Sequence, residues 1–475
     1  MATQLFSDEI VYSKGIMAHG NYKYLRVVPL GSTQNPTLSL TSTVQTQFEL
    51  PDNVMNLALS KLCFDIQIPT QGAVTKFNNV YANALSLIDR VTLTTRSGII
   101  LVDIPNTHIF GNLISAVKTK ASDLLHRNSP GYAMPAGTTT DNATAGQDAA
   151  SQASALVASQ LYPISDIIRC NGTVNYQMRE KVSAATNSLN AGAYTPYSEP
   201  LQLITAPALS QYNAISYQIN LSAFKDTLME INKNIYFGDN LVLTINWNSF
   251  TKCGFTTSAI VASAALTGAI AFTVAPSISN LFLYTACETD PTVISQLVSS
   301  VNNGTFNLIV PFVYGQKYNA SASTSSAMQQ RLNLSSGVSL LRIYFGCFNA
   351  TEDALTTYQH NDSCITSYNT YMDGLRLQDF TLSTADSTHW LANERNFNES
   401  SMLNLKQFKT NFIYIDNWCG VAPCLNDDTI LNGLSLESDR TWSIQTVTAS
   451  AAYRYYMYYT TQKKLTISRG AITLF

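Results

Sequence analysis

Residues 61–69 read KLCFDIQIP, and the pattern of this stretch recurs along most of the chain. Apolar Leu62, Phe64 and Ile66 alternate with smaller or polar side chains. Alternation with a period of two places one set of side chains in a core and the other set toward solvent or a second layer. The stretch therefore predicts a β-strand that is buried on one face.

The same period appears in ISYQINLS (215–222) and NLVLTINW (240–247). Further strands are expected at VQTQFEL, VTLTT, GIILVDI, LLRIYFGCF, GLRLQDFTL, NFIYIDNW, TWSIQTV and YRYYMYYT. Connections rich in Ser, Thr, Asn and Gly separate them, which is typical of β-sandwiches. Helical patterns are few, the best being HIFGNLISAVKTKASDLLHR (108–127) and PTVISQLVSSVN (291–302). The sequence therefore predicts an all-β fold with a few short helices.

Composition agrees with such a fold. Charged residues make up 12% of the 475 residues, about half the usual ~25%, while hydrophobic residues make up 45%. This balance argues against a coiled coil and against a disordered chain. The formal net charge of −3 gives no net field to attract nucleic acid. Length allows roughly three domains of about 150 residues, or two larger β units.

Two stretches of the sequence show whether a secretory signal or a membrane-spanning segment is to be expected: the first residues and the longest charge-free stretch. MATQLFSDEIVYSKG (1–15) carries two early acids and no apolar core, so we expect no secretory signal. Residues 254–277, GFTTSAIVASAALTGAIAFTVAPS, are the single transmembrane candidate. They are rich in Ala, Ser, Thr and Gly, and a proline interrupts them near the end. We therefore expect a buried or interface segment there rather than a membrane span.

The eight cysteines contain no CxxC pair. Most are scattered singly, several in apolar runs where thiols act as small core residues. Without a signal peptide we expect them to be reduced. A bridge between Cys419 and Cys424 is left open, because only four residues separate them.

A weak internal repeat divides the chain. LALSKLCFDIQIP (57–69) and GVSLLRIYFGCF (337–348) each follow a polar, alternating run, and each half closes with a polar-edged strand followed by an aromatic one. We predict an N-terminal arm over residues 1–40 and a first sandwich over 41–290. A linker would follow at 291–304 and a second sandwich at 305–475. Residues near 135–200 are poor in large apolar side chains in their first part and predict a long exposed loop inserted in the first unit.

Residues able to carry chemistry are sparse. No nucleophile elbow, phosphate loop, dinucleotide fingerprint, zinc-protease motif or calcium loop occurs. The five histidines are far apart and lack acid or cysteine neighbours at ligand spacing. His108 opens a predicted helix and is expected to have a capping or core role. His389 precedes Trp390 in a loop-like run and is a weak candidate for a functional residue. Asp427 and Asp428 could bind a cation, but a turn or helix start is favoured.

Basic and aromatic clusters have structural interpretations as well. The first 40 residues carry a net charge of about +1, too little to neutralise many phosphates. Lys463, Lys464 and Arg469 form the single late basic cluster, where a solvated strand edge is favoured over contact with an anionic surface. The tyrosines of YRYYMYYT (453–460) could stack on sugars, but their strand-like setting favours core or subunit-interface packing.

With these strand pairs in order, the sequence resembles the double jelly-roll major capsid proteins of icosahedral double-stranded DNA viruses, of the virophage and Polinton-like virus type. The likeness rests on patterns of strands and turns over most of the chain. The stretches that carry it are TLSLTSTVQTQFELPDNVMNLALSKLCFDIQIP (37–69), ALSLIDRVTLTTRSGIILVDIPNTHIFGNLISAVK (84–118), IVPFVYGQKYNASASTSSAMQQRLNLSSGVSLLRIYFGCF (309–348) and SDRTWSIQTVTASAAYRYYMYYTTQKKLTI (438–467).

The resemblance implies two consecutive eight-stranded jelly-roll sandwiches. It implies a structural protein of the virion, not an enzyme, that forms homotrimeric, pseudo-hexameric capsomers and tiles an icosahedral shell. Expected partners are copies of itself, penton proteins and minor capsid proteins, with no sequence-specific nucleic acid. No catalytic, cofactor-binding or metal-binding residues are expected, and no cofactor. The alternative is a β-sandwich viral spike or lectin-like adhesin that binds glycans.

Overall fold

The computed structural model of the chain describes most of both predicted halves. The described residues are 22–31, 35–67, 76–79, 84–115, 118, 201–202, 214–257, 274–320, 325–349, 365–384, 387–396, 412–420, 433–448 and 453–475. The predicted loop near 135–200 lies outside them, and so do Asp427, Asp428 and most of the transmembrane candidate. Within the described part, no helix is both long enough and apolar enough to cross a bilayer.

The first sandwich consists of two four-stranded antiparallel sheets. One sheet has the order β1 (Tyr22–Val27), β11 (Ser277–Glu288), β3 (Met55–Gln67) and β8 (Ala214–Asn220). The other has the order β2 (Val44–Leu50), β9 (Leu241–Trp247), β5 (Ile88–Thr95) and β6 (Ile100–Pro105). A small third sheet joins β10 (Gly254–Thr257), β4 (Lys76–Asn79) and β7 (Leu201–Gln202).

The second sandwich also has two sheets. One runs β12 (Phe306–Ala320), β21 (Tyr453–Ser468), β14 (Ser339–Asn349) and β18 (Ile413–Asn417), with β19 (Leu434–Ser435) and β22 (Ala471–Leu474) added at the ends of β14 and β21. The other runs β13 (Ser325–Leu332), β20 (Arg440–Thr448), β15 (Ile365–Met372) and β16 (Leu375–Arg376), with β17 (Leu382–Ser383) on β15.

Both sandwiches have the same strand order. When the main strands of each are numbered one to eight along the chain, one sheet of each reads 1-8-3-6 and the other reads 2-7-4-5. In the first sandwich these strands are β1, β2, β3, β5, β6, β8, β9 and β11; in the second they are β12, β13, β14, β15, β16, β18, β20 and β21. This is the jelly-roll arrangement. The prediction of two consecutive eight-stranded jelly rolls is confirmed.

The residues that alternate in the sequence are the ones buried in the core of the first sandwich. In β9, Leu241, Leu243, Ile245 and Trp247 are buried, with half-buried residues between them. In β3, Leu62 and the adjacent alternate residue Phe64 are buried in the same way. Cross-strand pairing then stacks these side chains between the two sheets of the first sandwich.

The first strand lies earlier than expected. The residues of β1 fall inside the 1–40 segment predicted as an arm, yet β1 pairs antiparallel with β11 from Tyr22 opposite Glu288 to Val27 opposite Leu283. Residues 22–27 are therefore part of the first sandwich, and the arm prediction is wrong for them. The strand YKYLRV turns basic and aromatic side chains outward, so its apolar alternation is weak.

The helices are short. The helical pattern at 108–127 gives α3 (Thr107–Phe110) followed by a π-turn, η3 (Gly111–Ser115), and Lys118 is helical as well. The predicted helix between the halves forms as α8 (Pro291–Asn303). The Asp290 carboxylate accepts a hydrogen bond from the Thr292 amide at its start, and Pro291 occupies the first turn. Val293, Leu297 and Val301 form its buried stripe.

One cysteine differs from expectation. Cys63, Cys287 and Cys419 are present as thiols, and Cys424 lies outside the described residues. Cys347 in β14 is disulfide-bonded, so the expectation that all thiols are reduced is wrong there.

Candidate functional site: the buried junction between the two sandwiches

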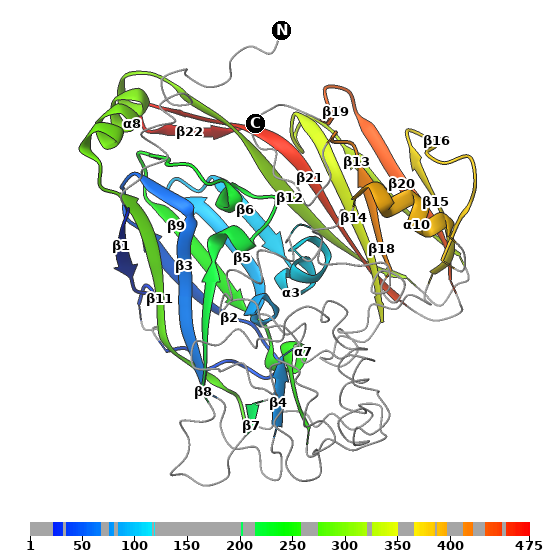
Figure 1. Cartoon of the computed structure of the whole chain (residues 1–475), viewed down its shortest axis with the longest axis horizontal. Coiled ribbons are helices and arrows are strands. Elements are labelled where there is room, and N and C mark those ends of the chain that lie inside the picture. Colours follow the sequence, from blue (N-terminus) through cyan, green and yellow to red (C-terminus); the bar gives the residue numbers. More distant parts are fainter. Residues whose placement is uncertain are drawn as a thin grey trace, which may run out of the picture.

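The sheet containing β12, β21, β14 and β18 is buried on both faces along β14. In β14, Ile343 and Phe345 point into the core of the second sandwich, whereas Tyr344 and Phe348 pack into the core of the first. Figure 1 shows β12, β21 and β14 crossing the middle of the molecule, with β6 and α3 on one side and β20 and β15 on the other. This explains why LLRIYFGCF is a nearly continuous apolar run rather than an alternating one.

Two glycines allow the sandwiches to approach each other closely. A Cβ atom at Gly315 in β12 would lie 2.8 Å from Cγ of Pro105, and one at Gly346 in β14 would lie 2.6 Å from a Leu113 methyl carbon. Both distances are too short for real carbon atoms. Glycine in the interior of a strand often marks such a close approach.

Tyr458 bridges the junction. Its hydroxyl lies 3.1 Å from the carbonyl oxygen of Pro105 and 3.0 Å from that of Asn106, so it donates to the backbone where β6 ends. Its ring meets Phe110 of α3 edge to face, with centroids 5.6 Å apart. One side chain of β21 thereby contacts both the strand end and the helix of the first sandwich.

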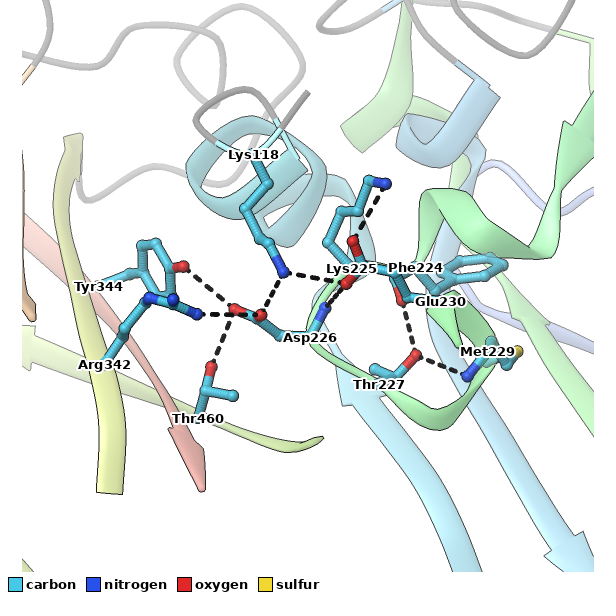
Figure 2. Close-up of polar contacts among 10 residues, drawn as sticks. All are labelled: Lys118, Phe224, Lys225, Asp226, Thr227, Met229, Glu230, Arg342, Tyr344 and Thr460. Carbon is cyan, nitrogen blue, oxygen red and sulfur yellow. Dashed lines mark hydrogen bonds and ion pairs between the residues drawn. The ribbon is translucent and has the colours of Figure 1, made fainter. Parts of the chain in front are cut away.

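Acidic side chains face the second sandwich from the segment after β8. Asp226, at φ 58, is 1% exposed, and its amide donates to Oε2 of Glu230 at 2.8 Å. Thr227 caps the short helix η8 (Leu228–Glu230) by accepting from the Met229 amide. Nζ of Lys118 lies 2.6 Å from Oδ1 of Asp226 and 3.0 Å from Oε2 of Glu230. Figure 2 shows these groups converging on Asp226.

The second sandwich contributes the other half of this network. The hydroxyls of Tyr344 and Thr460 each donate to Oδ2 of Asp226 at 3.1 Å. Nη1 of Arg342 lies 3.7 Å from Oδ1 of the same carboxylate. Asp226 is thus the point where β14 and β21 of one sandwich are tied to the loop and helix of the other (Figure 2). We call Lys118, Asp226, Glu230, Arg342, Tyr344 and Thr460 the junction network.

Charge pairing keeps the network ionised. Burial alone would raise the pKa of the Asp226 and Glu230 carboxyls, but nearby cations, chiefly Lys118, outweigh it and the pKa of both is lowered. Burial likewise opposes the charged form of Lys118, yet the two carboxylates raise its pKa. Removing one member of such a buried set would leave the remaining charges buried without an opposite charge beside them, which is strongly destabilising. The network therefore fixes how the two sandwiches are oriented.

Both candidate histidines are buried. His108 in α3 is 4% exposed, and burial lowers its pKa to about 3. His389 lies in α10 (Thr388–Asn393), not in a loop, and burial lowers its pKa to about 4. Its Nδ1 is 2.5 Å from the Tyr368 hydroxyl and its ring stacks on Phe412. Both are neutral core residues at neutral pH.

The late basic and aromatic residues divide between surface and core. Lys463 extends over Phe312, 4.5 Å from the ring centroid, and Arg469 turns the chain from β21 into β22 at φ 51. The tyrosines of β21 are at most 6% exposed, which leaves no face for sugar stacking. Tyr453, Tyr455 and Tyr459 face the core of the second sandwich, and Tyr456 and Tyr458 face the junction.

The junction network was not among the residues predicted from sequence. Two signals could have found it. In this charge-poor chain, AFKDTLME (223–230) holds three charges within six residues, and Arg342 interrupts the most apolar strand. Among the described residues, no three His, Cys, Asp or Glu side chains come together in a way that could hold a metal ion.

Comparison with known proteins finds similar structures but no similar sequences. No family model and no curated protein matches the sequence. A chain in the cryo-EM structure of the Sputnik virophage is similar with a TM-score of 0.53 and 12% identity, covering 96% of this chain and 88% of that one. VP54 of PBCV-1, fitted into a reconstruction of Sputnik, gives 0.51 and 10%, covering 96% and 97%. The Faustovirus major capsid protein gives 0.50 and 10%, covering 94% and 90%. The chain has the double jelly-roll fold of these capsid proteins.

Proposed function

We propose that this chain is a structural major capsid protein that forms homotrimeric, pseudo-hexameric capsomers and tiles an icosahedral virus shell. The observation that carries the proposal is that two jelly rolls of identical strand order are locked side by side in one body. The fold likeness to the Faustovirus major capsid protein supports the same role.

The geometry suits a wall-building subunit. Two similar sandwiches in each chain make six in a trimer, which allows three copies to fill a sixfold lattice position. A rigid junction is required for this, because a wall whose two halves swing freely cannot keep one outline. Low charge also suits subunits that bury broad side surfaces against one another, since desolvating ions is costly.

The proposal places the protein in the virion, with copies of itself, penton proteins and minor capsid proteins as partners and no enzymatic activity. Nucleic-acid binding should be weak, because the net charge of −3 supplies few phosphate contacts. Gel-shift measurements at physiological salt should show no micromolar complex with double-stranded DNA.

Native mass spectrometry and electron microscopy of the purified protein test the proposal. We expect a species of three times 52.0 kDa that further assembles into hexagonal arrays or shells. A discrete oligomer that binds glycans and never forms arrays would favour the spike or adhesin alternative. A stable monomer at high concentration would overturn the capsid role.

A further inference from the structure

Strand β18 lies at the edge of its sheet in the second sandwich. It is the last strand in the order β12-β21-β14-β18, and it pairs with β14 from Ile413 opposite Gly346 to Asn417 opposite Arg342. On its other side, no strand in the part of the chain that the structure describes pairs with it. A strand edge of this kind presents backbone N–H and C=O groups to which a strand of another chain can bond.

The sequence of β18 favours such pairing. Residues 412–418 read FIYIDNW, which begins with four large apolar or aromatic side chains and contains no proline and no basic residue. Segments of this length with high β-propensity and low net charge are prone to aggregate by strand addition. Charged side chains commonly protect an edge strand. The single charged residue of this segment, Asp416, is 5% exposed and accepts a hydrogen bond from the Trp442 indole, so it does not protect the edge.

Two asparagine side chains occupy the pairing position at the centre of β18. Oδ1 of Asn393 accepts a hydrogen bond from the Ile415 amide at 2.8 Å, and Nδ2 of Asn396 donates to the Ile415 carbonyl oxygen at 3.0 Å. One residue of a neighbouring antiparallel strand would make this same pair of bonds, to one N–H and one C=O. We call Asn393 and Asn396 the edge cap.

The local helix presents both cap residues to the strand. Asn393 ends α10, and Asn396 ends the 3-10 turn η10 (Glu394–Asn396) that follows it. Residues three apart lie on one side of a helical turn, and both asparagines are 0% exposed. Nδ2 of Asn393 also donates to the His389 carbonyl oxygen at 2.8 Å, which fixes which way its amide faces.

The helix that carries the cap is fastened to the sandwich on both sides. At its start, the Ser383 amide at the end of β17 donates to Oγ1 of Thr388 at 2.8 Å. The His389 ring stacks on Phe412, directly before β18, with centroids 5.1 Å apart. These contacts hold α10 against the edge of β18.

We propose that the edge cap is an autoinhibitory contact, which occupies the pairing position of β18 and prevents β18 of a second copy of the chain from adding to this sheet. Without the cap, the N–H and C=O of Ile415 would lose their partners, which is costly for buried groups. Antiparallel pairing with β18 of a second copy restores both bonds. The contact is isologous, because each copy offers the same strand.

Removing the cap tests the proposal. In Asn393→Ala with Asn396→Ala, both side-chain bonds to Ile415 are lost. We expect this cap variant to associate under native conditions into species of at least twice the parent's mass. Its association constant should exceed that of the parent by at least about 100-fold, measured by sedimentation velocity over a series of protein concentrations.

A control variant removes two other buried asparagines. Asn56→Ala with Asn234→Ala changes residues that are 1% and 2% exposed and hydrogen-bonded through their side chains, but that lie in the first sandwich. This variant should also lose stability, yet it should keep the parent's mass. If the control associated as strongly as the cap variant, loss of stability alone would explain the association, and the proposal would be wrong.

A proline at the centre of β18 separates strand addition from general unfolding. Ile415→Pro removes the amide that faces away from β14 and obstructs an incoming strand, and proline is tolerated at such edge positions. Added to the cap variant, it should restore the parent's mass, whereas Ile415→Val, which keeps the amide, should not. Association as strong with the proline as without it overturns the proposal, and so does a cap variant that keeps the parent's mass.

Hydrogen exchange over residues 412–418 locates the contact. The segment should exchange faster in the dilute cap variant than in the parent, and it should become protected again on association. Association without renewed protection there would place the contact elsewhere and contradict the proposal. If the cap variant does not fold, Asn396→Ala, which leaves the Asn393 bond in place, carries the same comparisons. Each mass is compared with that of the parent, so the result does not depend on the proposed trimer.

Discussion

The 1-8-3-6 sheets of the two sandwiches have the same topology but different surroundings. In the second sandwich this sheet separates two cores, and every residue of β14 from Ser339 to Phe348 is buried. In the first sandwich, β3 buries Leu62 and Phe64 and leaves Cys63 and Asp65 half-buried on the outer side. Identical strand order therefore does not imply equal burial. A strand covered on both faces has a continuous apolar run, whereas a strand covered on one face alternates between apolar and polar residues.

Removing the Asp226 carboxylate at the junction should cause the largest loss of stability. In Asp226→Ala, Lys118 and Arg342 lose their shared partner inside the junction. We expect a loss of about 3–5 kcal/mol in the free energy of unfolding, measured by urea denaturation. Asp65→Ala on the outer side of β3, where Asp65 accepts a bond from exposed Asn280, should cost less than about 1 kcal/mol. If Asp226→Ala cost as little free energy of unfolding as Asp65→Ala, the junction network would not be stabilising the fold.

Filling the gap at Gly346 should produce the next largest effect. Gly346→Ala places a methyl group against Leu113 and should destabilise the protein by about 1–3 kcal/mol through overpacking. Leu113→Ala removes the clashing atoms, so the double variant should be more stable than the sum of the single losses. Strict additivity in this double-mutant cycle would mean that the two side chains do not meet.

Acid should act on both sandwiches through one buried histidine in each. The pKa of His108 is lowered to about 3 and that of His389 to about 4. Between pH 6.5 and about 4 the unfolded chain binds protons that the folded imidazoles do not, so stability is complete above pH 6.5 and falls as the pH drops. The expected slope is on the order of 1 kcal/mol per pH unit for each histidine. Denaturation curves from pH 8 to 4 should be flatter for the variant His108→Gln with His389→Gln, and an unchanged slope would contradict the assignment.

The smallest effect should come from the loop predicted near 135–200. Its segment 135–159 is rich in small residues and gains little by burial. Deleting Thr138 to Gln152 should leave the melting temperature and the trimer mass unchanged, with any defect confined to shell assembly. Differential scanning calorimetry and native mass spectrometry provide the measurements. Loss of the folded trimer would identify this segment as part of the core.

Much of the fold could be predicted because β-sandwiches have local signals. The period of two in β9 and β3, the Pro291 start of α8 and the recurrence of strand pairs all follow from short stretches of sequence. The first strand was missed for the same reason, since β1 shows little alternation until β11 is placed beside it.

The candidate site could not be predicted, because it joins distant positions. Asp226 meets a lysine 108 residues before it and hydroxyls 118 and 234 residues after it. No spacing rule covers such separations.

Sequence alone determined that this chain is all-β, that it contains two related units, and that its surfaces carry little charge. These properties depend on side-chain period and composition, which are local. Tertiary structure decided that one sheet is shared between two cores. It also decided that Gly315 and Gly346 lie where the two sandwiches approach most closely. Finally, it decided that Asp226 is paired with Lys118 and Arg342 and accepts a hydrogen bond from Tyr344. The physical reason is that burial and ion pairing depend on distances in space, which chain folding sets and sequence separation does not.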